Sequence, residues 1–138
     1  MPTSPTQWDD CRVDPAKERQ LIVLAFRGMG GRLTGAIARR LPLNVGVETL
    51  RVPVSEQVIA TEILKLAASM GDVIEAQPPQ LSWVARVRNP AVVTVTLKSL
   101  DSEVEVTVRA AAAEGLLKQR TGEKTAAAVA ERLQHGAG

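Results

Sequence analysis

The fold of this chain is decided by residues 48–71, which read ETLRVPVSEQVIATEILKLAASMG. The first part alternates apolar side chains with polar ones or proline, as a half-buried strand does. Pro53 cannot donate to a hydrogen-bond ladder, so we expect this strand at a sheet edge. Ser55 is a good helix N-cap, and Gly71 tolerates the left-handed conformation that often ends a helix. The apolar residues between them form one stripe at helical period, namely Ile59, Ile63, Leu66, Ala67 and Met70. The stretch therefore predicts an edge strand followed by a helix with one buried face.

Segments with the alternation of strands follow this helix. They cover residues 72–77, 81–88, 93–98 and 103–109. If Val95 pairs with Val106, one face of the last hairpin stays apolar, and Lys98 lies opposite Glu103 as a favourable cross-strand pair. This register places the tip of the hairpin at residues 100–101.

The hairpin before it requires a different turn. Pairing Ala85 with Val95 and Val87 with Val93 keeps apolar residues on one face only if the connecting loop has an odd length. We therefore expect a longer or bulged turn around residues 89–90 rather than a two-residue turn.

The N-terminal third is less regular. Residues 1–13 are rich in proline and small polar residues, which predicts a mobile tail. A helix is expected over 15–26, although the apolar run at 21–26 also fits a strand. The glycines within 28–31 interrupt that element, and a second short helix is expected over 32–41.

The C-terminal part predicts one more helix. Residues 110–120 read as a helical or loop connection, a helix is expected over 122–134, and residues 135–138 should fray. Together the elements predict a single α+β domain over 14–134. Its antiparallel sheet has four to five strands with helices packed on one face, in the order β-α-β-β-β-α after the N-terminal helical segment.

Composition restricts the class of protein. The chain has 138 residues, a net charge of +2 and a single cysteine, Cys11, so an internal disulfide is excluded and a reducing compartment is favoured. The N-terminus lacks the basic and apolar regions of a signal peptide, and the longest apolar run, 21–26, is too short to cross a bilayer. We expect a cytoplasmic protein.

Catalytic chemistry is poorly supported by the sequence. The only histidine, His135, lies four positions from the end, and Cys11 lies in the expected tail, so neither is held as a general base or nucleophile. One residue of each kind is also too few for a metal site. The glycines at 28–35 match neither a dinucleotide fingerprint nor a Walker loop. The sequence predicts no catalytic residue, no metal and no cofactor, and therefore no enzyme.

Basic residues gather in one segment. Residues 12–51 contain eight Lys and Arg against three Asp and Glu. Four of the arginines stand among apolar residues, namely Arg27, Arg32, Arg39 and Arg40. A basic amphipathic helix here would contact an anionic surface, either a membrane or nucleic acid. The other interpretation, which we prefer, is the solvated face of helices that pack on the sheet.

Trp83 is the third candidate. On its strand it shares a face with Leu81 and Ala85, so it is expected in the core. If the space between sheet and helices is open, Trp83 would instead line an apolar ligand cavity. The helix would contribute Ile59, Ile63 and Met70 to that cavity.

From residue 48 to 133 the chain resembles the START-like, helix-grip ligand-binding families. The resemblance is carried by LRVPVSEQV entering a helix, by the meander VTVTLKSLDSEVEVTVRA, and by the closing helix. It implies a curved antiparallel sheet that grips a C-terminal helix around an apolar cavity.

These observations favour a non-enzymatic binding or interaction module. Its partner would be an apolar small molecule or another protein. The alternative is a peripheral module that meets a membrane or nucleic acid through residues 27–40, and an enzyme ranks third. The exposed edge at 48–54 also permits a homodimer by strand pairing.

Overall fold

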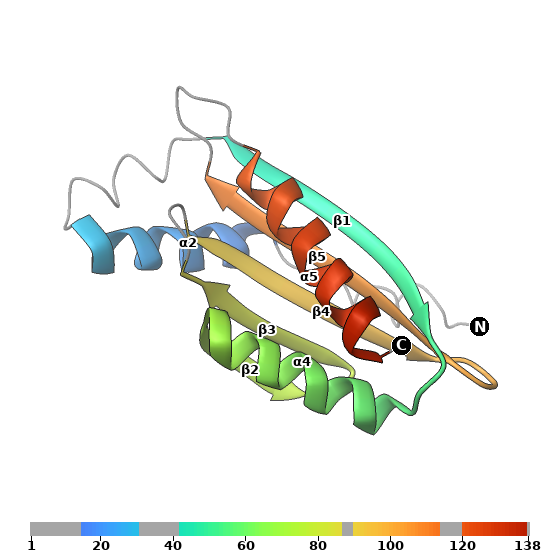
Figure 1. Cartoon of the computed structure of the whole chain (residues 1–138). Helices are drawn as coiled ribbons and strands as arrows, with labels where there is room; N and C mark the ends of the chain where they lie inside the picture. Colours follow the sequence, from blue (N-terminus) through green and yellow to red (C-terminus); the bar gives the residue numbers. More distant parts are fainter. Residues whose placement is uncertain (1–14, 31–41, 87–89, 114–119, 138) are drawn as a thin grey trace, which may run out of the picture.

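A computed structural model shows a five-stranded antiparallel sheet in the strand order β1-β5-β4-β3-β2, with helices on both faces (Figure 1). The structure describes residues 15–30, 42–86, 90–113 and 120–137. Its elements are α2 (Pro15–Gly30), β1 (Leu43–Val52), α4 (Glu56–Met70), β2 (Gly71–Gln77), β3 (Gln80–Ala85), β4 (Ala91–Ser99), β5 (Val104–Ala113) and α5 (Thr121–Ala137). The predicted α+β class and antiparallel sheet are confirmed.

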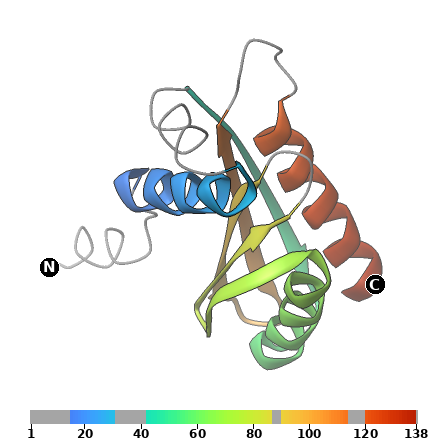
Figure 2. The same ribbon diagram turned by 90° about the vertical axis from the view of Figure 1, so that its left-hand side faces the viewer.

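The helices divide between the two faces of the sheet (Figure 2). α4 and α5 lie on one face, as expected, and enclose the larger core cluster. α2 lies on the other face, where Ile22 and Ala25 pack with Val84, Val92 and Ala111. The expectation of helices on one face therefore holds for α4 and α5 and differs for α2. Near its middle, the sheet is apolar on both sides, and both sides need a cover.

The strand–helix unit forms as its sequence predicts. Ser55 Oγ accepts a hydrogen bond of 3.2 Å from the Val58 N–H, and Ile59 and Ile63 are fully buried. Gly71 has an extended φ of 171°, not the left-handed conformation that was expected. Glycine is required there because an added Cβ would overlap with the carbonyl oxygen of Val84 on β3.

β1 is an edge strand, but its bounds differ from those predicted. It begins at Leu43, ends at Val52, and pairs with β5 along its whole length. β5 in turn continues to Ala113, so the prediction of a helical or loop connection from residue 110 was wrong for 110–113. Alanine has a low strand propensity, but these four alanines are buried on the two faces of the sheet, and this packing decides their conformation.

Both hairpins keep the predicted faces but not the predicted partners. Lys98 lies opposite Glu105, and Val95 lies opposite Val108, two residues further along β5 than expected. The loop spans residues 100–103 and is closed by a 2.8 Å bond from the Leu100 N–H to the Glu103 carbonyl. A slip of two residues leaves every side chain on its face, so alternation alone cannot exclude it.

The turn between β3 and β4 is long, as predicted. Ala85 pairs with Ala91 and Leu81 with Val95, so five residues separate the strands. The expected pairing of Ala85 with Val95 was wrong, again with the face preserved, and Val93 pairs with Trp83. Val87 lies outside the described residues.

The helix termini also differ from the prediction. Residues 21–26 are helical, and α2 continues past them through Gly28 to Gly30. α5 continues to Ala137, beyond the expected end at 134. The expected tail at 1–13 and the short helix at 32–41 lie outside the described residues. Within the described ranges, no helix is long and apolar enough to cross a membrane.

Candidate functional site

Trp83 lies at the centre of the core between the sheet and α4. The structure brings Trp83 together with the other three predicted ligand residues in one cluster: Ile59 and Ile63 are fully buried, and Met70 packs against them. Trp83 itself is 0% exposed. A cavity wide enough for water beside these side chains would leave them some accessible surface. In this structure Trp83 is therefore a core residue, and a ligand would reach it only if the core opened.

The indole nitrogen of Trp83 is an exception within this core. Trp83 Nε1 is buried and has no hydrogen-bond acceptor in the described part of the chain. Burying a donor without an acceptor costs about 1–3 kcal/mol, and most native structures avoid it. The core thus holds one unused hydrogen-bond donor.

A groove lies between α4 and α5 on the outer side of this core. It has a volume of about 310 Å³ and is lined by Glu62, Lys65, Leu66 and Ser69 of α4 and by Arg132, Leu133 and Gly136 of α5. Leu66 and Leu133 belong to both the groove and the core cluster of Trp83. The groove therefore has an apolar floor that is continuous with the core.

Charged side chains surround this floor. Lys65 Nζ lies 3.6 Å from Glu62 Oε1, so these two charges compensate each other. Arg132 is exposed and forms no ion pair with any described residue. The groove therefore carries one uncompensated positive charge beside an apolar floor.

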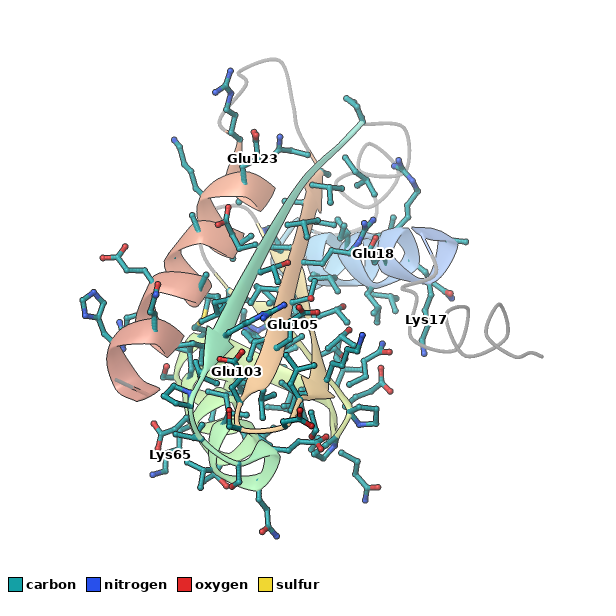
Figure 3. The ribbon with its side chains drawn as sticks, turned by 90° about the vertical axis from the view of Figure 1, so that its right-hand side faces the viewer. Lys17, Glu18, Lys65, Glu103, Glu105 and Glu123 are labelled. Carbon is teal, nitrogen blue, oxygen red and sulfur yellow. The ribbon has the colours of Figure 1, made fainter. Side chains whose placement is uncertain are left out.

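The opposite face of the sheet carries a buried ion pair. Glu18 of α2 is 1% exposed and meets Arg109 of β5, while the neighbouring Lys17 points away from the sheet (Figure 3). Two hydrogen bonds, of 2.8 and 2.9 Å, join the carboxylate to the guanidinium. The hydrogen bond from Arg109 to Glu18 raises the pKa of Arg109, burial lowers it, and the charge of Glu18 raises it further. Because each charge is compensated by the other across the α2–β5 contact, we interpret this pair as structural.

The described residues contain no group of three or more His, Cys, Asp and Glu that could hold a metal ion. His135 lies near the end of α5 with its side chain 80% exposed, 3.9 Å from Glu131. Such a histidine is not positioned against a nucleophile. Cys11 lies outside the described residues, as do Arg32, Arg39 and Arg40, and the side chain of Arg27 is not described either.

The sequence did not predict this groove. The predicted ligand residues Trp83, Ile59, Ile63 and Met70 belong to the core and do not line it, and of its lining only Leu66 and Leu133 were part of the predicted buried stripes. Arg132 and Gly136 gave no signal because they look like ordinary surface residues. Glu18 was also missed, since a single carboxylate on a predicted helix is usually solvated. Only the approach of α2 to Arg109 distinguishes it.

Comparison of the chain with protein-family models, with curated proteins and with solved structures found no match.

Proposed function

We propose that this chain is a non-enzymatic binding module that holds a small apolar molecule with one anionic group in the groove between α4 and α5. The observation that carries this is the exposed Arg132, without an acidic partner in the described residues, beside the apolar floor of Leu66 and Leu133. Such a floor binds apolar surface, and the cation selects and orients an acidic group.

The size of the groove limits the ligand. Ligand sites in proteins span roughly 300–1,000 Å³. A groove of about 310 Å³ is at the lower end of that range, so we expect a small ligand with no more than about three rings or with a short chain. The resemblance to the helix-grip families supports a ligand site on this side of the sheet, because the ligands of those families lie between the sheet and the closing helix.

The unused indole donor supports a deeper binding mode. A ligand that separates Leu66 from Leu133 would reach the cluster that contains Trp83. A carbonyl or carboxylate oxygen of that ligand would then accept the Trp83 Nε1 hydrogen bond that no described residue accepts. The single cysteine of the chain agrees with a reducing compartment such as the cytoplasm as the place of binding.

The test uses 8-anilinonaphthalene-1-sulfonate, an apolar dye with one anionic group, and the Trp8→Phe variant, in which Trp83 is the only tryptophan. We expect saturable binding of one dye per chain and a change in Trp83 emission. Arg132→Glu should weaken binding by roughly fivefold, as expected for a partly exposed charge pair of about 1 kcal/mol. The control is Lys124→Glu, which changes an exposed charge of α5 outside the groove and should leave the affinity unchanged.

Near-UV circular dichroism during the titration shows whether the core stays packed, because this dye also binds loosened cores. Absence of saturable binding, or equal weakening by Arg132→Glu and Lys124→Glu, would contradict the proposed site. The contact with an anionic surface through 27–40 remains a separate prediction. Its test is whether Arg39→Glu/Arg40→Glu and added salt both reduce binding to anionic vesicles or nucleic acid.

A further inference from the structure

The two edges of the sheet differ in their readiness to accept another strand. β2 is short, carries a bulge between Val73 and Glu75, and is followed by Pro78 and Pro79, all of which hinder pairing. β1 is ten residues long and pairs with β5 without a bulge, and its outer edge has no partner strand among the described residues. A long regular edge of this kind is a template for another strand.

If two copies of β1 pair over nearly their whole length, Leu43–Val52, the two-fold axis lies at one of the two middle residues, Val47 or Glu48. Centring on Glu48 puts two glutamates directly opposite each other, which is unfavourable. Centring on Val47 places Glu48 opposite Gly46 of the other copy. It also pairs the two Val47 side chains, each 53% exposed in the single chain. The sequence of β1 therefore favours one antiparallel register.

α5, which packs over β1, has an exposed flank that could contact the same flank of a second copy. Its flank toward β1 begins at Glu123, whose N–H and carboxylate bond to Asn44 of β1. At helical spacing the same flank continues through Ala127, Ala130 and Gln134, which are exposed or half-buried. Arg132 and Gly136, which line the groove, lie on the opposite flank. Small residues at the centre let two such helices approach closely, with Glu123 beside Gln134 of the other copy.

The same two-fold axis relates both the β1 edges and the α5 flanks of the two copies. Gly122 packs against the carbonyl of Asn44, and α5 runs alongside β1 in the same direction (Figure 1). Val47 lies three residues beyond Asn44, about 10 Å along the strand. The midpoint between Ala127 and Ala130 lies about 10 Å beyond Gly122 along the helix. A two-fold axis through Val47 therefore passes the centre of the small-residue flank.

The spacing of the helices is also suitable. α5 lies over β1 and β5, so its axis is about one strand spacing, roughly 5 Å, from the two-fold axis. The two α5 helices would then be about 10 Å apart, within the usual packing distance of helices.

We propose that a second copy of this chain occupies this surface: β1 pairs antiparallel with β1 about a two-fold axis at Val47, and α5 packs against α5 through Ala127 and Ala130. The two sheets join into one of ten strands. The groove with Arg132 stays open, because it lies on the opposite flank of α5. The homodimer is independent of the proposed ligand.

The register is tested by disulfide formation in the full chain carrying Cys11→Ser. Directly opposed antiparallel residues have Cα atoms about 4.5–5.5 Å apart, within disulfide range. In the proposed dimer, Val47→Cys should therefore give a covalent dimer rapidly under mild oxidation. Glu48→Cys is the matched control, because the two Glu48 Cα atoms would be roughly 8 Å apart, too far for a disulfide.

The helix contact is tested by sedimentation equilibrium. Ala127→Arg should weaken dimerisation at least about tenfold, which corresponds to about 1.4 kcal/mol. Ala128→Arg makes the same change at an adjacent exposed residue on another side of α5 and should leave the dimer intact. Val73→Lys, on the other sheet edge, should also have no effect. A wild-type chain that stays monomeric overturns the proposal. So does a dimer in which position 48 crosslinks as fast as position 47, or in which the two arginine variants behave alike.

Discussion

Glu18 and Arg109 connect α2 to β5 through two hydrogen bonds between residues 91 positions apart in the chain. The Glu18 carboxylate is almost completely buried, while the Arg109 side chain is 29% exposed. A buried carboxylate is tolerated when a charged donor saturates it, and a guanidinium does so with two parallel bonds. This pair therefore fixes the position and rotation of α2 on the second face of the sheet.

Glu18→Gln should lower the free energy of unfolding by about 2–3 kcal/mol, because it leaves Arg109 partly buried without a counter-charge. The measurement is urea unfolding at neutral pH. Glu103→Gln is the control, since Glu103 forms an exposed pair of 3.4 Å with Arg51 and should change stability by no more than about 0.5 kcal/mol. Equal effects of the two substitutions would show that the Glu18 pair contributes no more than a surface pair.

The pH dependence of this pair follows from the raised pKa of Arg109. A cation with a raised folded-state pKa stabilises the fold fully below its unfolded pKa, and this stabilisation is lost only as the pH rises through the folded value. Arginine stays protonated in both the folded and the unfolded chain over the whole range in which the protein can be handled. The difference in stability between wild type and Glu18→Gln should therefore be constant from about pH 7 to about pH 10. A difference that declines within this range would contradict the assignment.

The unit at 48–71 could be predicted because its signals are local. The Ser55 cap, the stripe through Ile59 and Ile63, and the edge character of β1 all act within a few residues. They needed no knowledge of the rest of the chain.

The register could not be predicted for a physical reason. Alternation fixes which face a residue occupies but not which of several partners it meets, so Lys98 was assigned to Glu103 instead of Glu105. The strand at 110–113 was missed because alanine favours helices, and only its pairing with 43–46 of β1 and with 91–93 of β4 makes it extended. Such long-range contacts override local preference.

Gly122 and Gly46 make a further prediction, because they bring the start of α5 against β1 backbone to backbone. An added Cβ on Gly122 would overlap with the carbonyl of Asn44, and one on Gly46 with the backbone of Glu123. Backbone atoms can move aside only by distorting the strand. Gly122→Ala should therefore lower the free energy of unfolding by about 3 kcal/mol or more, as severe steric conflicts do.

The control for this substitution is Gly136→Ala in the same helix. Its Cβ would lie 3.9 Å from Glu62 Oε2, an ordinary contact, so thermal unfolding should show no loss and a slight gain from helix propensity. A tolerated Gly122→Ala would mean that α5 does not approach β1 this closely.

Asn44 should cap α5 although it belongs to a distant strand. Its Oδ1 accepts the Glu123 N–H at 2.9 Å, and its Nδ2 donates to Glu123 Oε2 at 3.1 Å. Asn44→Ala should cost about 1 kcal/mol, the usual value for a lost cap. Asn44→Asp retains the acceptor but places two carboxylates together, so its cost should fall as salt is added. Chemical denaturation at two salt concentrations measures both effects.

The groove could not be predicted from the sequence for a related reason. Trp83 and Met70 belong to strongly patterned elements, so their place in the core could be inferred, but neither residue lines the groove. Arg132 gains significance only from its position across the groove from α4, which depends on how two helices separated by four strands along the chain are placed against each other. No local pattern encodes that placement.

Trp83→Phe and Ile63→Ala should differ in a way that isolates the unused indole donor. Both side chains are fully buried in the same core cluster, and both substitutions remove the same number of heavy atoms. Ile63→Ala should cost about 2–5 kcal/mol, since it loses burial and leaves a cavity. Trp83→Phe has a similar loss but also removes a donor without an acceptor, which relieves about 1–3 kcal/mol. We therefore expect Trp83→Phe to be the less destabilising of the two by about 1–3 kcal/mol in urea unfolding. If it is as costly as Ile63→Ala, Nε1 has an acceptor in solution, and a ligand would gain no hydrogen bond there.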